Sequence, residues 1–171
     1  MQDLIILGGN PGSGKTTISH LLEAYGFERL SIDDFYQQTP RSPEIKNWFE
    51  DQTFLDQAYA SFRKEIFDAL DQDQHLVIET TGVGNRWKEL LSEFESKYHD
   101  RLIKIYLDTS RETSGQRIQA RNETDYPIKM SEERLDAFFQ LGKDTSSEYD
   151  QVIDANGATE DTLQAVLAFV K

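Results

Sequence analysis

The segment Gly9–Thr16 has the residue types and spacing of a loop that binds phosphate. It reads Gly-Asn-Pro-Gly-Ser-Gly-Lys-Thr, which fits the pattern of a glycine, four residues and then Gly-Lys-Ser/Thr. Glycines permit backbone conformations that aim successive N–H groups inward, and the N-terminus of a following helix adds its dipole there. We expect Lys15 to reach the β- and γ-phosphates of a nucleoside triphosphate and the Thr16 hydroxyl to bind Mg²⁺. The expected nucleotide-binding residues are Gly9, Asn10, Pro11, Gly12, Ser13, Gly14, Lys15, Thr16 and Thr17.

Acidic residues follow two of the expected strands. Asp33 and Asp34 close the second strand, where a carboxylate can accept a proton from an attacking hydroxyl, hold a metal-bound water or cap the next segment. Glu79 closes the third strand, where it either supports a metal shell or lies in a solvated turn. The expected metal-binding residues are therefore Thr16, with Asp34 or Glu79 in the outer shell.

Two arginines, Arg117 and Arg121, are four residues apart and so share one face of a helix. Placed over a nucleotide, their guanidinium groups would neutralise charge on the transferring phosphoryl group. The alternative is a solvated basic face. Because a polar break separates this helix from the next, we expect residues 117–131 to form a lid that covers the site and excludes water.

The elements that must position these residues alternate between apolar runs and helical periodicity. The expected strands are residues 4–7, 29–32, 76–78, 102–107 and 151–154, and apolar residues at helical spacing mark helices near residues 18–25, 55–67, 87–94, 109–122, 131–139 and 163–170. Such alternation predicts an α/β fold with a parallel sheet covered on both faces, and ligands in such sheets bind beyond the carboxyl ends of the strands.

Local signals mark some boundaries between these elements. Pro40, Pro43 and many polar side chains predict a loop over residues 37–51. Thr109 followed by Glu112 is typical of a capping box that opens a helix, and Ser131 marks another helix start.

Length and composition favour one domain over residues 1–171 that acts on small molecules. A chain of 171 residues is about one domain. The net charge of −13 argues against a nucleic-acid partner, because such proteins gain most of their affinity from Lys and Arg on phosphates. The chain has no cysteine, no apolar run near the roughly 18 residues that cross a membrane, and no recognisable secretory signal. We therefore expect a cytoplasmic protein with no membrane partner; the oligomeric state is left open.

Four further segments accompany the phosphate loop: Ser31–Tyr36 (Ser-Ile-Asp-Asp-Phe-Tyr), Val77–Gly82 (Val-Ile-Glu-Thr-Thr-Gly), Arg117–Asn122 and Met130–Leu135. In this order the series resembles the small P-loop kinases grouped around phage polynucleotide kinase and zeta toxin, and more distantly shikimate and gluconate kinases. The resemblance implies a three-layer P-loop kinase fold, with a five-stranded parallel sheet in the order 2-3-1-4-5, helices on both faces and a small lid. It also implies that Asp33 is the general base and that Arg117 or Arg121 contacts ATP phosphates.

The segment after Asp33 narrows the expected substrate. Polynucleotide kinases carry an arginine shortly after the catalytic aspartate, whereas this chain has Phe35-Tyr36-Gln37, which argues against a polynucleotide. The Asp-Asp-Phe-Tyr stretch also resembles uridine and related nucleoside kinases. We therefore expect an ATP- and Mg²⁺-dependent kinase that phosphorylates a hydroxyl of a small, nucleoside-like or other molecule, with Lys15, Asp33, Arg117 and Arg121 as catalytic residues.

Two alternatives stay open. One is a 5′-hydroxyl polynucleotide kinase. The other is an ATP-binding regulatory switch or NTPase that acts through a partner; a GTPase switch is disfavoured, because the chain has no Asn-Lys-x-Asp guanine motif.

Overall fold

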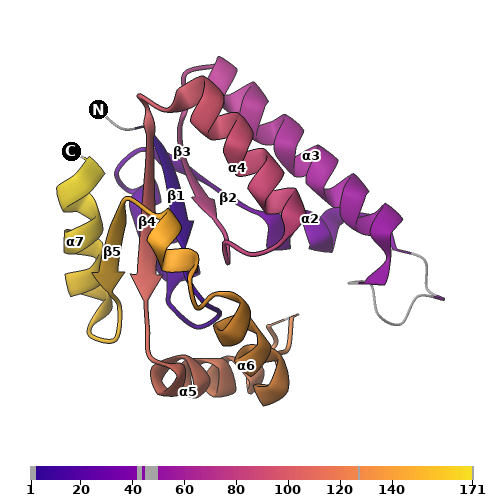
Figure 1. Ribbon diagram of the computed structural model, residues 1–171, viewed down its shortest axis with the longest axis vertical. Helices are drawn as coiled ribbons and strands as arrows, with labels where there is room; N and C mark the ends of the chain where they lie inside the picture. The colour runs from indigo at the N-terminus through magenta and orange to yellow at the C-terminus, as the bar shows by residue number, and fades with distance from the viewer. Residues whose placement is uncertain (1–2, 42–43, 45–49, 127, 171) are drawn as a thin grey trace.

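A parallel sheet of five strands forms the centre of the molecule. The computed structural model describes residues 3–41, 44, 50–126 and 128–170. The strands are β1 (Leu4–Gly8), β2 (Phe27–Ser31), β3 (His75–Glu79), β4 (Leu102–Asp108) and β5 (Gln151–Asp154). Their order in the sheet is β2-β3-β1-β4-β5, which confirms the predicted order (Figure 1). β1 is buried along its whole length, because β3 and β4 flank it and helices cover both faces of the sheet.

Helices pack on both faces of this sheet and make the three predicted layers. They are α1 (Lys15–Glu23), α2 (Ile32–Gln38), α3 (Gln52–Asp71), α4 (Asn85–Tyr98), α5 (Arg111–Asn122), α6 (Glu132–Leu141) and α7 (Thr159–Val170), and a short 3₁₀ turn, η2, spans Thr145–Glu148. Alternate residues of β1 point to opposite faces: Ile5 and Leu7 join the core cluster with α1 and α7, whereas Leu4 and Ile6 join the cluster with α3 and α4. Figure 1 shows α3 and α4 together on one side and α7 on the other.

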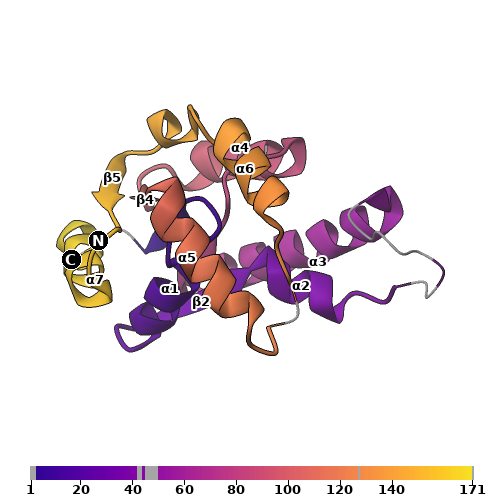
Figure 2. The ribbon, with the colours of Figure 1, turned by 90° about the horizontal axis from the view of Figure 1, so that it is seen from below.

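The helices α5 and α6 lie beyond the carboxyl end of the sheet, apart from the two main layers (Figures 1 and 2). They have a small apolar cluster of their own, in which Ile118, Met130 and Leu135 are buried. Because this cluster is separate from the two core clusters, the pair of helices has its own packing. None of the helices in the described part of the chain has the length and apolar character needed to span a bilayer.

The predicted boundaries around the second strand differ from the structure. The predicted second strand ends one residue earlier, at Ser31, and Ile32 begins α2; Asp33 and Asp34 therefore lie in the first turn of a helix. That helix extends to Gln38, so the predicted loop over residues 37–51 begins later, and residues 42–43 and 45–49 lie outside the described residues.

The predicted cap at Thr109 is wrong, because this residue is buried and its hydroxyl pairs with that of Ser114 at 2.8 Å. Ser110 caps α5 instead, and its Oγ accepts a hydrogen bond from the Thr113 N–H at 3.0 Å. The predicted helix start at Ser131 is confirmed: Ser131 Oγ accepts from the N–H of Arg134 at 3.2 Å.

Candidate active site

The phosphate-loop residues join the end of β1 to the start of α1, between a buried strand and a helix as the sequence predicts. Gly12 and Gly14 have φ values of 82° and 94°, a left-handed backbone that only glycine adopts without strain. A Cβ at Gly12 would also lie 2.8 Å from the carbonyl oxygen of Ser114, so a side chain has no room there. The glycines therefore let the loop turn tightly under α5 and begin α1 with its N–H groups facing the site.

The Lys15 side chain turns back over the loop. Its Nζ donates hydrogen bonds to the carbonyl oxygens of Gly9 at 2.7 Å and Asn10 at 2.9 Å. Burial lowers the pKa of Lys15 to about 8, although the carboxylates of Glu79 and Asp33 oppose this change. An anion at the loop would favour the charged form of this amine, so Lys15 is placed to respond to phosphate.

Glu79, at the end of β3, is buried and lies beside the loop. One carboxylate oxygen accepts from Thr16 Oγ1 at 2.8 Å, and the other accepts from Ser19 Oγ at 2.5 Å and from Arg29 Nε. A buried carboxylate is stable only when it is paired and hydrogen-bonded, and here both oxygens are. Glu79 therefore fixes the Thr16 hydroxyl at the edge of the phosphate loop.

Ser19 and Arg29 are functional candidates that no sequence motif indicated. Arg29 occupies an inner position of β2, and its Nη1 also donates to Asp34 Oδ2 at 2.6 Å. Burial lowers the pKa of Arg29, but the attraction of Glu79 and Asp34 outweighs burial, so the pKa is raised and the guanidinium stays charged. The signal that could have found Arg29 is a charged residue within a run that otherwise reads as a buried strand.

The two adjacent aspartates point to different places. Asp33 and Lys15 line the same cavity. Burial raises the pKa of Asp33 above its ordinary value, while Lys15 opposes this change. Asp34 is not among the cavity-lining residues, and its carboxylate is engaged by Arg29. The structure therefore brings Asp33, but not Asp34, to the place where a substrate would meet the phosphate loop.

The two arginines of α5 also differ in their contacts: Arg117 bonds backbone carbonyls, whereas Arg121 keeps one buried donor without a partner among the described residues. Arg117 Nη2 donates to the carbonyl oxygen of Ala155 at 3.0 Å, and Nη1 donates to that of Gly12 at 3.3 Å. Arg121 lies with its guanidinium 4.4 Å from the centre of the Tyr126 ring. Among the described residues, its Nε is one of two buried side-chain nitrogen or oxygen atoms without a hydrogen-bond partner. An unsatisfied buried donor needs an explanation, and an anion in the cavity would supply one.

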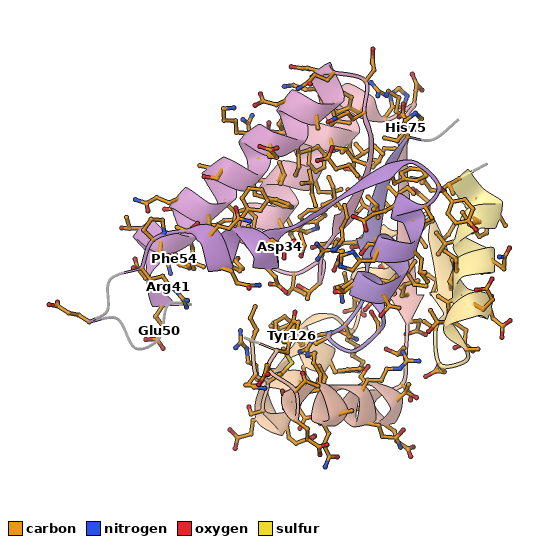
Figure 3. The ribbon with its side chains drawn as sticks, turned by 180° about the vertical axis from the view of Figure 1, so that it is seen from behind. Asp34, Arg41, Glu50, Phe54, His75 and Tyr126 are labelled. Carbon is orange, nitrogen blue, oxygen red and sulfur yellow. The ribbon has the colours of Figure 1, made fainter. Side chains whose placement is uncertain are left out.

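A cavity of about 590 Å³ joins these residues. Six of the nine predicted nucleotide-binding residues line it: Pro11, Gly12, Gly14, Lys15, Thr16 and Thr17. The other three, Gly9, Asn10 and Ser13, are buried in the loop and do not line the cavity. Both α5 arginines, Asp33 and Glu79 also line it. Figure 3 shows Asp34 on α2 and Tyr126 from the α5–α6 segment on opposite sides of this region. The volume is in the usual range for a small-molecule site.

The oxygen atoms beside the phosphate loop could serve as ligands of a magnesium ion. Among the described residues, no three His, Cys, Asp or Glu side chains form a cluster that could hold a metal ion by themselves. Mg²⁺ prefers oxygen ligands and is usually bound by one or two protein groups together with substrate phosphates. The Thr16 hydroxyl is such a group beside the phosphate loop, and Glu79 fixes it there. The residues present therefore fit a magnesium ion shared with a nucleotide.

Comparison with known proteins gives matches over most of the chain. A family model described as an AAA domain matches residues 4–143. Adenylate kinase isoenzyme 1 of Rattus norvegicus is 24% identical over 98% of this chain and 93% of that protein. A Sulfurisphaera tokodaii protein named as a candidate adenylate kinase is 36% identical over 81 residues, 45% of this chain and 39% of that protein. Shikimate kinase from Acinetobacter baumannii, solved with shikimate, has a TM-score of 0.69 at 25% identity and covers 99% of this chain and 93% of its own.

Proposed function

The chain belongs to the AAA domain family, in which it is a P-loop kinase, and we propose that it transfers the γ-phosphoryl group of ATP to a hydroxyl of a small molecule. The observation that carries this proposal is the position of Asp33. Its carboxylate lines the same cavity as Lys15 and acts electrostatically on that amine, so a proton acceptor lies beside the expected phosphate site.

The reaction needs one bond to form and one to break. The acceptor oxygen forms a bond to the γ-phosphorus, the bond between that phosphorus and the β,γ-bridging oxygen breaks, and ADP leaves with the bond electrons. The proton of the acceptor hydroxyl passes to Asp33. Burial raises the pKa of Asp33, which makes the carboxylate a better base than an exposed aspartate, and the nearby Lys15 opposes this rise.

Positive groups hold the phosphates in this scheme. Lys15 leaves the loop carbonyls for the β- and γ-phosphates, and Arg121 donates its unsatisfied Nε–H to the phosphoryl group. Arg117 fixes residues 155–157 against the phosphate loop, where the base of the nucleotide would pass. Magnesium, held by Thr16 with Glu79 behind it, would offset negative charge on the phosphates. Residues 117–131 act as a lid within one domain.

Other assignments are less well supported. A 5′-hydroxyl polynucleotide kinase needs a basic path for the strand, whereas the net charge is −13. A switch that only binds a nucleotide has no use for a proton acceptor in the cavity, whereas an NTPase would use one on water and is separated from a kinase by its products. A phosphate acceptor, as the names of the adenylate kinase relatives suggest for those proteins, would need no base either.

Asp33→Asn tests the assignment of the base. We expect turnover to fall by about 10²–10⁴-fold, because asparagine keeps the size of the side chain but cannot take the proton. The Kd of a non-hydrolysable ATP analogue should change little. Asp34→Asn removes the same charge one residue away but outside the cavity, so it controls for the electrostatic effect and should cost less turnover. Equal losses in the two variants, or a loss of analogue binding that matches the loss of turnover, would remove Asp33 from the role of base.

A further inference from the structure

Beyond Asp33, the cavity has a wall of aromatic side chains. Tyr36 of α2 and Tyr59 of α3 both line it, with ring centres 6.4 Å apart. Tyr36 stacks on Phe54 at 6.1 Å, and Tyr59 meets Phe62 edge-on at 6.2 Å. Because Phe54 and Phe62 are buried in the core, the two tyrosine rings are held from behind and form a rigid surface.

The hydroxyl groups of this wall are neutral. Tyr36 and Tyr59 are hydrogen-bonded to each other through their side chains, and burial raises the pKa of both hydroxyls. The Asp33 carboxylate raises the pKa of Tyr36 further, so this ring lies close to the proposed base. The wall therefore offers flat apolar faces and neutral hydrogen-bonding groups next to the carboxylate.

The side of the cavity formed by the proposed lid is also lined by aromatic and apolar side chains. Tyr126, Ile128, Met130 and Phe138 line the cavity from the segment that joins α5 to α6 and from α6. The Arg121 guanidinium lies over the Tyr126 ring, which orients that ring beside the phosphate site. Figure 3 shows Tyr126 on the opposite side of this region from α2. Aromatic side chains therefore line the cavity both from α2 and α3 and from the segment between α5 and α6.

The charges in the cavity are balanced without a charged acceptor. Arg134 of α6 also lines the cavity. Burial lowers the pKa of Arg134, and the negative charge of Asp33 opposes this change, so these two charges offset each other. The remaining charged lining residues are Lys15, Arg117, Arg121 and Glu79, a formal excess of two positive charges. Magnesium-bound ATP carries about two negative charges at neutral pH. An acidic acceptor would add an unbalanced negative charge to a partly buried site, which is costly.

From these contacts we infer that the acceptor is an uncharged alcohol with a planar ring, of the nucleoside class. Its ring lies between the Tyr36–Tyr59 wall and Tyr126, and its hydroxyl meets Asp33. This inference rests on the proposed kinase function and adds the class of acceptor to it. It separates this chain from kinases whose acceptor is an acid, such as the shikimate named for the structural relative above.

An acceptor panel tests the inference. The probes are adenosine, guanosine, cytidine and uridine as neutral planar alcohols, gluconate and shikimate as acidic alcohols without an aromatic ring, and adenosine monophosphate as a phosphate acceptor. Transfer is followed by phosphorus NMR of the products with ATP and Mg²⁺. Each probe is also titrated calorimetrically against the protein saturated with a non-hydrolysable ATP analogue. We expect at least one nucleoside to bind and to be phosphorylated with the highest kcat/KM.

Substitutions of Tyr36 and Tyr59 test whether these two residues bind the acceptor. Tyr59→Leu and Tyr36→Leu should lower kcat/KM for the nucleoside by about 10–100-fold, because stacking on a base is lost, and should leave the KM for ATP unchanged. Tyr59→Phe keeps the ring and should cost less than about 10-fold. Tyr25→Leu is the matched control, because Tyr25 is 51% exposed and does not line the cavity. Thermal unfolding of each variant checks that it is folded.

Two outcomes overturn the inference and remain distinct from failure of the proposed function. Transfer to gluconate, shikimate or the monophosphate, with no nucleoside bound or phosphorylated, leaves the protein a kinase but removes the neutral planar acceptor. The inference also falls if no nucleoside binds to the analogue complex, or if the nucleoside kcat/KM is the same in Tyr36→Leu, Tyr59→Leu and Tyr25→Leu. Absence of transfer to every probe, with nucleoside binding that depends on the two tyrosines, would instead count against the kinase assignment.

Discussion

At the scale of single residues, the two arginines of α5 have separate tasks in the proposed site. Arg117 is engaged by backbone carbonyls of the phosphate loop and of residues 155 and 157. Arg121 has a buried Nε without a partner among the described residues and lies in the same cavity as Lys15. The sequence alone left open which of the two meets the transferred phosphoryl group, and the structure favours Arg121.

Arg121→Ala should therefore lower kcat by about 10²–10³-fold, the usual cost of losing one donor to a developing charge. Arg117→Ala should mainly raise the KM for ATP, because it loosens the segment beside the base. Steady-state kinetics with saturating acceptor separate the two effects. A larger loss of kcat in Arg117→Ala than in Arg121→Ala would reverse this assignment.

The roles of single residues could be predicted from the sequence where the residues belong to a motif. They could not be predicted where the contacts of a residue lie far away in the sequence. The loop pattern gave Lys15 and Thr16 their places, and the structure puts both in the cavity. Asp33 and Asp34 are adjacent in sequence and differ only in direction, which depends on the helical turn that holds them. The partners of Glu79 lie 60 residues away at Ser19 and 50 residues away at Arg29, a distance no local pattern spans.

At the scale of elements, Arg29 joins three pieces of the site. It lies on β2 and bonds Glu79 at the end of β3 and Asp34 in the first turn of α2, which also carries Asp33. Its side chain is 12% exposed and that of Glu79 is 5% exposed, whereas that of Asp34 is 39% exposed. Arg29 is therefore a positioning residue that holds the proposed base and the Thr16 contact in one arrangement.

Arg29→Gln should destabilise the fold by about 3 kcal/mol, near the lower end for a broken buried pair because Asp34 is partly solvated. Urea unfolding measures this change. Arg63→Gln is the control: it loses an ion pair with Glu93 in which both side chains are at least 36% exposed, and such pairs contribute at most about 1 kcal/mol. Equal destabilisation in the two variants would show that Arg29 has no special structural role.

The pair α5–α6 is expected to move as a lid. Its apolar cluster is separate from the core, and its own ties join its parts: Arg111 pairs with Glu132 and Asp136, and Asn122 bonds both backbone groups of Met130. Amides of residues 117–126 should exchange more slowly when magnesium and an ATP analogue are bound, because Arg117 and Arg121 then contact the ligand. Amides of residues 163–170 of α7, whose apolar side chains pack in a core cluster and do not line the cavity, serve as the internal reference. Unchanged exchange in residues 117–126 would argue for a fixed cover.

The elements differ in how well the sequence predicts them. The strands β1, β3 and β4 follow from apolar runs that are largely buried, and α3, α4 and α7 follow from regular apolar spacing. The helix α2 was missed because it has seven residues and no buried side chain, so no periodic pattern marks it. The sheet order came from the family resemblance, because apolar runs alone do not say which strands are neighbours.

At the scale of the whole molecule, charge and fold favour a small ligand. The net charge is −13, while four cationic side chains, those of Lys15, Arg117, Arg121 and Arg134, line the cavity of the proposed site. A nucleotide needs only these local cations, whereas a polynucleotide would also meet the acidic surface. The carboxyl ends of β1, β2 and β3 supply the phosphate loop, Asp33 and Glu79 to the same edge of the sheet, as ligands in parallel α/β sheets require.

The central claim is that the protein moves the γ-phosphoryl group to an alcohol, and the balance of products tests it most directly. ADP, free phosphate and phosphorylated alcohol are measured together, with and without the acceptor panel, for the native chain and for Lys15→Ala. We expect ADP to form fast only with an acceptor, each ADP to be matched by a phosphorylated alcohol, and Lys15→Ala to abolish both while remaining folded. Equal rates of ADP and free phosphate formation with or without any acceptor would contradict it and identify an NTPase instead.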